Sequence, residues 1–301
     1  MTELWTTLSE RESTSAAPLR DGVPAGLEGP LREWVYGAAR KRGHAAARVA
    51  VRCNIDLRAE DMGSEDVDHA ERLAYRTPAN QLLDAVDALL GLIGPGPMTP
   101  PPSGSITWYG ALHMLQQAPA WAARSQLQQL LNDSRSLYTV RADGQALARR
   151  TDPAVAALLA TAAEAADQPE RGSATRHLRQ ASDAAYALKP DPVKAYSEAI
   201  KAVEAAAHTT MQPNHPKATL GTMLGELRQV RGRLTVPLLG KNATEGIETV
   251  EKMMELLWTG QTSRHGNLQN TRDETVDEAT MAVHIAATLV QMFASGAVRR
   301  S

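Results

Sequence analysis

The 301-residue sequence predicts a mainly α-helical protein with two domains, because a chain of this length is ample for two cores. Apolar residues recur at helical spacing through most of the chain, and alanine is frequent among them. One short pair of β-type segments interrupts this pattern, near residues 137–149. A stretch rich in proline and glycine, residues 94–102, ends one helical pattern because proline cannot continue a helix.

Composition limits the function classes. The 32 Lys+Arg residues nearly balance the 34 Asp+Glu residues, so any nucleic-acid site must be local. Cys53 is the one cysteine, which excludes an intrachain disulfide and favours a reducing cytoplasm. The N-terminus lacks the basic start and apolar run of a signal peptide. The longest apolar runs, 154–166 and 281–293, fall short of the roughly 20 residues of a membrane span. We therefore expect a cytoplasmic protein without a membrane partner.

The first domain is expected at residues 27–150, after a flexible polar tail at 1–26. A helical stripe starts at Leu27 and Trp34 and can continue to Val49 as one pattern. Five basic residues accompany it. They are Arg40, Lys41, Arg42, Arg48 and Arg52. A solvated helix face is the simpler interpretation, and a nucleic-acid-binding face is the alternative.

A small β-hairpin is expected to close the first domain. Residues 137–140 are typical of a strand, and 145–149 can return as its partner. Asp143-Gly144 between them is a favoured pair for a type I′ turn.

The second domain is expected at residues 151–301, with a four-helix bundle as its core at 191–296. Four helix-start signals lie in this domain, each an N-cap residue with a proline or an acid at the right position, and the last three of them start helices of the bundle. They are Asp152-Pro153, Asp191-Pro192, Asn242 with Glu245, and Thr275 with Glu278.

The chemistry candidates lie between the last two helices, where Arg264 and His265 stand next to each other between Gly260 and Gly266. An arginine can hold a phosphate through its planar fork, and a neighbouring histidine can move a proton. Three neighbours can supply neutral hydrogen bonds, namely Gln261, Ser263 and Asn267. Glu204, beside an apolar stripe, is the acid expected to partner Arg264. The alternative interpretation is a helix end, with Gly266 as its left-handed cap.

Other chemistry has less support. Glu65 and His69 have helical spacing but no third metal ligand, and no cofactor fingerprint is present, so neither a metal nor a cofactor is expected. His284, within the apolar last helix, is expected to be a packed histidine. Glu198 is expected on a solvated face beside Lys194 and Lys201.

Four sequence blocks resemble AbiJ-type abortive-infection proteins in order and approximate spacing. The blocks are residues 191–204, Ala218-Thr219-Leu220-Gly221, Ser263-Arg264-His265-Gly266 and Val276-Asp277-Glu278-Ala279. Upstream, Gly22-Val23-Pro24 and the segment 137–147 also resemble that layout.

The resemblance implies a C-terminal bundle of the HEPN superfamily. Many members are metal-independent ribonucleases that act as toxins or in phage defence, with a site at a homodimer interface. There an Arg and a His separated by four to six residues face the partner's copy. In this chain Arg264 is adjacent to His265, and positions 258–260 carry no cation. Neighbouring helical residues point about 100° apart, so both can face one phosphate only where the backbone departs from a helix.

The expectation is an abortive-infection-like, homodimeric protein that binds or cleaves RNA as an endoribonuclease. Arg264 would grip phosphate, His265 would act as acid and base, and Glu204 would orient them. The alternative is a catalytically inactive helical module that dimerises or binds a partner protein.

Overall fold

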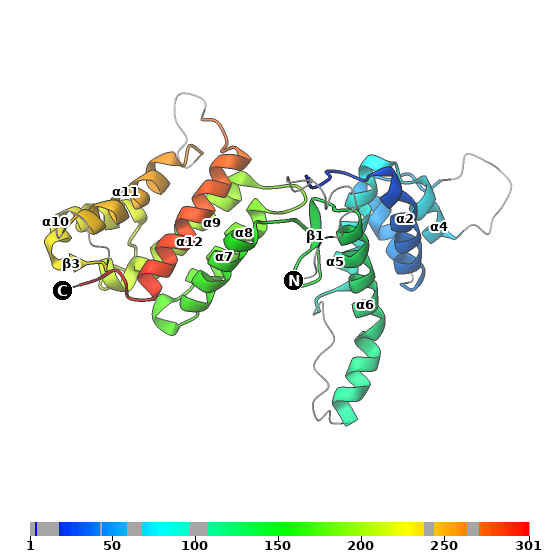
Figure 1. Cartoon of the computed structure of the whole chain (residues 1–301), viewed down its shortest axis with the longest axis horizontal. Helices are drawn as coiled ribbons and strands as arrows, with labels where there is room; N and C mark the ends of the chain where they lie inside the picture. Colours follow the sequence, from blue (N-terminus) through cyan, green and yellow to red (C-terminus); the bar gives the residue numbers. More distant parts are fainter. Residues whose placement is uncertain are drawn as a thin grey trace, which may run out of the picture. The chain divides into compact units, whose positions relative to one another are not determined.

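The chain divides into two compact units, Met1–Arg150 and Thr151–Ser301, each described here by itself (Figure 1). The computed structural model describes Leu4 and residues 18–42, 44–58, 68–96, 108–237, 244–263 and 271–300, with backbone alone at 108–119. Both units are mainly helical, as predicted, and their strands form two small two-stranded sheets. Within these residues, no helix has the length and apolar character to cross a membrane.

The N-terminal unit is built around helix α2. Its elements are α2 (Ala25–Arg40), α3 (Ala45–Cys53), α4 (His69–Arg76), the short 3-10 turn η1 (Ala79–Gln81), α5 (Leu82–Ile93), α6 (Trp108–Asp133), β1 (Tyr138–Val140) and β2 (Leu147–Arg149). Helix α2 packs against α4, α5 and α6, and α3 packs against α5. Leu31, Trp34 and Val35 of α2 are buried in this core.

Two expectations for this unit are wrong. The stripe from Leu27 to Val49 belongs to two helices, because the chain turns after Arg40 and α3 starts at Ala45. Residues 20–26 are part of the folded unit rather than a tail: Arg20 forms a parallel bridge with Ser136, and α2 already starts at Ala25. Backbone pairing, which a polar composition does not reveal, holds this segment.

The β-hairpin is confirmed, but its turn differs from the expected one. Tyr138 pairs with Arg149 and Val140 pairs with Leu147. A type I′ turn needs two consecutive residues with positive φ, whereas here Gly144 alone (φ 71°) has one. The connection is a longer loop, closed by a hydrogen bond from the Arg141 N–H to the Ala146 carbonyl.

Arg124 of α6 explains why glycine is required in that loop. Its side chain is fully buried and donates from Nε to the Gly144 carbonyl (3.1 Å) and from Nη2 to the Gly94 carbonyl. A Cβ at Gly96 or Gly144 would overlap the guanidinium. Burial lowers the pKa of Arg124, and backbone carbonyls supply the hydrogen bonds that a buried cation needs.

The C-terminal unit is a helical bundle centred on α9 and α12. Its elements are α7 (Pro153–Ala165), η2 (Pro169–Arg171), α8 (Ala174–Ala185), α9 (Pro192–Met211), α10 (Leu220–Val230), η3 (Arg231–Arg233), β3 (Leu234–Thr235), α11 (Glu245–Gly260), α12 (Val276–Ala294) and β4 (Arg299–Arg300). Helix α9 packs against α8 and α12, and α12 also packs against α7. The four expected helices therefore share one core with α7 and α8.

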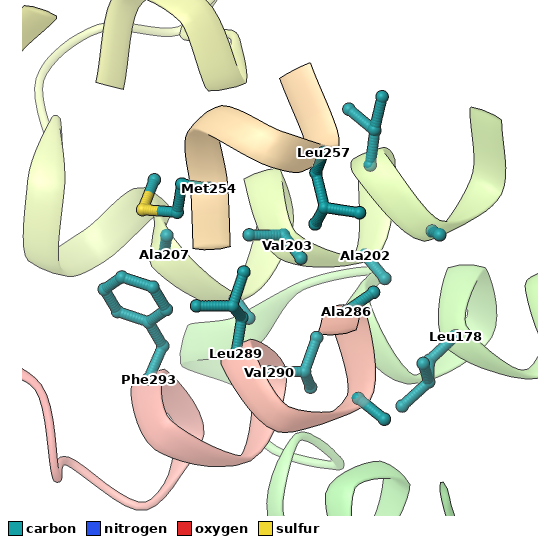
Figure 2. Packing of buried hydrophobic residues seen from close by; sticks show 14 of the residues in the cluster. Leu178, Ala202, Val203, Ala207, Met254, Leu257, Ala286, Leu289, Val290 and Phe293 are labelled. Carbon is teal, nitrogen blue, oxygen red and sulfur yellow. The ribbon is translucent and has the colours of Figure 1, made fainter. Parts of the chain in front are cut away.

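Small and large side chains alternate in this core. Figure 2 shows Leu289 and Val290 of α12 on one side of Val203 of α9, with Met254 and Leu257 of α11 on the other side, and Phe293 of α12 at the edge of the cluster. Most alanines of α9 and α12 are buried as well, which allows the two helices to approach closely. Dense interdigitation of this kind is what stabilises a helical core.

Three of the four expected helix starts are confirmed. Asp152 and Asp191 accept hydrogen bonds from N–H groups of the first helical turn, and Thr275 forms a complete capping box with Glu278. The box expected at Asn242 is wrong for α11, which starts at Glu245 with Thr244 as its N-cap residue; Asn242 lies outside the described residues.

Candidate functional site

The structure describes the expected site after α11 only as far as Ser263. Arg264, His265 and Asn267 lie outside the described residues, whereas Gln261, Ser263 and Glu204 lie within them. Helix α11 ends at Gly260, with Gln261 as its C-cap residue. The interpretation of Gly266 as the cap of this helix is therefore wrong, since the helix has ended before the chain reaches Arg264.

A buried carboxylate anchors the chain just before Arg264. Glu274 is only 3% exposed, and it accepts hydrogen bonds from the Ser263 N–H (2.9 Å) and the Ser263 hydroxyl (2.8 Å). The Thr262 hydroxyl lies 3.4 Å from Glu274 and donates to the Arg272 carbonyl (2.9 Å). Burial acts to raise the pKa of Glu274, but the hydrogen bonds from Ser263 outweigh it and hold that pKa below its usual value. The carboxylate is thus ionised and fixes Ser263 next to the start of α12.

Close packing, rather than backbone freedom, explains the glycine at the end of α11. A Cβ at Gly260 would overlap the hydroxyl of Tyr196, which comes from α9. In the same way, Gly221 of α10 leaves room for the ring of Trp258. Gly260 lies inside the helix, so the expected break in the helical backbone occurs after it. These contacts fix the end of α11 against α9 and α10.

Glu204 has a partner that the sequence did not suggest. Its Oε1 accepts a hydrogen bond from the Leu220 N–H (2.7 Å) at the first turn of α10. A carboxylate is favourable there because the first N–H groups of a helix are unpaired and its N-terminus is electropositive. The observed role of Glu204 is thus to fix the start of α10 on α9. Its pairing with Arg264 stays a prediction.

A second polar cluster lies between α8 and α9. Nδ1 of His177 is 2.5 Å from Oε2 of Glu198, and Nζ of Lys201 is 2.7 Å from Oε1 of the same carboxylate. The Glu198 side chain is only 12% exposed, so its expected place on a solvated face is wrong, although its pairing with Lys201 is confirmed. Burial acts to raise the pKa of Glu198, but the hydrogen bonds from Lys201 and His177 outweigh it and lower that pKa.

The pairing of His177 with Glu198 could not be predicted from the sequence. The two residues are on different helices, and no local motif links them. The close packing of α8 on α9 brings them together.

His284 is a packed histidine, as expected. Its Nε2 lies 2.6 Å from the Tyr186 hydroxyl, and the two rings are stacked. Burial lowers the pKa of His284 and raises the pKa of Tyr186. Among the described residues, no three His, Cys, Asp or Glu side chains are grouped so as to hold a metal ion.

Two features therefore combine defined geometry with chemical capacity. One is the Ser263–Glu274 anchor, from which the chain continues to Arg264 and His265. The other is the His177–Glu198–Lys201 cluster. Comparison of the chain with known protein families, curated proteins and solved structures finds no match.

Proposed function

We propose that the C-terminal unit is an abortive-infection-like, HEPN-like module that binds or cleaves RNA at residues 261–267. The Ser263–Glu274 anchor carries the proposal. The buried, ionised carboxylate of Glu274 accepts hydrogen bonds from the N–H and the hydroxyl of Ser263, so the position of the residue before Arg264 is fixed. A residue pair that acts on a substrate needs such a rigid support.

The proposed chemistry needs no metal. Arg264 holds a phosphate of the RNA backbone through its fork of donors. His265 takes the proton from a ribose 2′-hydroxyl or gives one to the leaving 5′-oxygen. Ser263 acts as an anchor, because its N–H and its hydroxyl are both donated to Glu274. Gln261 and Asn267 are left to supply neutral hydrogen bonds to the substrate.

A homodimer is part of the proposal. Leu256 of α11 is 61% exposed and Met281 of α12 is 57% exposed. Both belong to the end of the unit where α11 finishes and α12 begins, next to the proposed site in sequence. Burying such side chains against a second copy is favourable at roughly 25 cal/mol per Å² of apolar surface. The variant with Leu256→Glu and Met281→Glu is therefore expected to be monomeric in analytical ultracentrifugation, while Lys252→Glu, at an exposed site on α11, leaves the dimer intact.

The nuclease proposal is tested with total RNA in the presence of a chelator. We expect RNA loss with the wild-type protein and with His215→Ala, an exposed histidine on another loop, and none with His265→Ala. Intact RNA at high wild-type concentration would overturn the cleavage claim. Fluorescence polarisation with labelled RNA then tests binding, which Arg264→Ala is expected to weaken.

A catalytically inactive dimerisation or partner-binding module is the second candidate function. One observation favours it: Arg264 and His265 are adjacent, and no cation occupies positions 258–260. A wild-type dimer that neither cleaves nor binds RNA would establish this function in place of the first.

A further inference from the structure

The segment that ends α2 and forms α3 differs in charge from the rest of the chain. Between Trp34 and Ile55 the sequence has five Lys and Arg residues and no Asp or Glu, although acids slightly outnumber bases over the whole chain. Positive charge is therefore concentrated here in a protein whose net charge is close to zero.

Two of the five basic side chains are engaged within the N-terminal unit. The Arg42 guanidinium donates to the Ala38 carbonyl (3.0 Å), and burial lowers the pKa of Arg42. The Arg40 guanidinium lies over the ring of Tyr36, 5.6 Å from its centroid, and 4.0 Å from the carboxylate of Asp68. Arg40 and Arg42 therefore have structural roles at the end of α2.

The other three basic side chains are exposed and keep their charge unpaired. They are Lys41, Arg48 and Arg52. Among the residues that the structure describes, no acid lies within ion-pair distance of these three, and the acids nearby have other partners. Asp56 pairs with Arg58 (3.0 Å), and Asp87 of α5 accepts a backbone N–H of the hairpin (2.6 Å). By contrast, exposed arginines elsewhere, such as Arg228 and Arg272, pair with glutamates.

The exposed positions of α3 form one continuous surface, which together with Lys41 we call the α3 face. Ala47 and Val51 form one row along the helix, and Arg48 and Arg52 form the row beside it. The Val51 side chain is 84% exposed, more than the other exposed large apolar side chains of the described residues. The two arginines lie one turn apart, so their like charges repel each other until an anionic partner neutralises them.

The charge of the α3 face suits a polyanion, and its shape suits double-stranded DNA. An α-helix fits the major groove of B-DNA, whereas the major groove of an RNA duplex is too deep and narrow for side chains to read. The small side chains of Ala47 and Val51 allow the helix backbone to approach the floor of a groove. The longer side chains of Arg48 and Arg52 can then reach the phosphates beside it. An anionic membrane fits less well, because Val51 is the one large apolar side chain of the face.

We propose that the N-terminal unit binds double-stranded DNA through the α3 face, with α3 in the major groove. Lys41, Arg48 and Arg52 donate to phosphate oxygens, and Val51 contacts base edges such as the thymine methyl group. Sequence preference is weak, because most of these contacts are to the backbone. The α3 face includes no residue of the segment 261–267, so the proposal goes beyond the action on RNA.

Fluorescence anisotropy of the full-length protein with a short labelled DNA duplex tests the proposal. With three phosphate contacts, affinity is expected to fall by about 40-fold between 50 mM and 200 mM salt, because each contact adds about −0.9 to the slope of log K against log salt. The double variant Arg48→Ala, Arg52→Ala keeps one contact, so its salt effect is expected to be about four-fold. At 50 mM salt it is expected to bind at least about ten-fold more weakly than the wild type. Alanine favours the helix at these exposed positions, so the fold is retained.

Two further variants separate the α3 face from general charge effects. Arg58→Ala is the matched control, since it removes an exposed arginine of the same unit whose charge Asp56 already neutralises, and it is expected to leave DNA affinity unchanged. Val51→Glu places a negative charge at an exposed position of the face without disturbing the core. It is expected to weaken DNA binding by at least about ten-fold, because like charges then meet.

Absence of DNA binding by the wild type at 50 mM salt, or equal losses in Arg58→Ala and the double variant, would overturn the proposal. Single-stranded RNA and vesicles of phosphatidylcholine with phosphatidylserine are measured in parallel. RNA or vesicle binding that the double variant loses at least as much as DNA binding would assign the α3 face to that partner instead. His265→Ala is expected to retain DNA binding, so a failure of the RNA assay and a failure of the α3 face are told apart.

Discussion

Replacing Glu274 by glutamine is expected to lower the free energy of unfolding of the C-terminal unit by about 2 kcal/mol at pH 7. The wild-type carboxylate accepts charge-assisted hydrogen bonds from the Ser263 N–H and hydroxyl in a buried setting. Glutamine keeps the shape of the side chain but has one acceptor oxygen, and its amide nitrogen would face a donor of Ser263. One hydrogen bond is lost and the other becomes neutral, whereas each had contributed about 1.5–3 kcal/mol.

The effect is measured by thermal and urea denaturation, following the transition of the C-terminal unit. For a unit of this size, 2 kcal/mol corresponds to a fall in melting temperature of about 4–8 °C. Asp273→Asn is the matched control, since Asp273 is exposed and adjacent in sequence, and it is expected to change the free energy by less than about 0.5 kcal/mol. Equal stabilities of Glu274→Gln and Asp273→Asn would refute the anchoring role.

The pH dependence of the unfolding free energy is a second test of the anchoring role of Glu274. The pKa of Glu274 is lower in the folded state, so the unfolded state binds the proton more readily. The stabilisation is fully present above the unfolded pKa of about 4.3, and it is lost as the pH falls through the folded pKa. The difference in unfolding free energy between the wild type and Glu274→Gln is therefore expected to shrink between about pH 5 and pH 3. A difference that stays constant over that range would assign the effect to packing instead.

Two further predictions concern packing in the same unit. Gly221→Ala is expected to lower the unfolding free energy by about 2 kcal/mol in calorimetry, because the new methyl group overlaps the ring of Trp258. Gly225→Ala is the control: a Cβ there meets open space, so this variant is expected to be as stable as the wild type or more stable. Equal losses of stability in the two variants would contradict the packing argument. Burial lowers the pKa of His284, so stability is expected to decrease as the pH falls below about 6.5. Comparison of melting temperatures at pH 7.5 and 5.5 in the wild type and in His284→Phe should show the smaller decrease in the variant, and identical decreases would exclude this histidine as the cause.

Local sequence determined the helix starts and the hairpin. Asp152, Asp191 and Thr275 cap helices through hydrogen bonds to N–H groups two or three residues away, so the information lies within one turn of chain. The hairpin strands pair over a short loop, which places their partners close in sequence. The helical stripes likewise predicted most helices, because burial of one face follows from periodicity alone.

Only the tertiary structure decided which polar side chains pair with each other. Glu274 belongs to the Ser263 anchor, and Glu198 belongs to a cluster with His177, because packing of separate segments creates those pairs. Gly260 flanks the Arg264–His265 segment in the sequence, and its contact with Tyr196 of α9 is what requires a glycine there. The sequence alone predicted the type of fold and marked Arg264 with its neighbours. Only the packed helices determined which carboxylates are buried, because burial depends on contacts far apart along the chain.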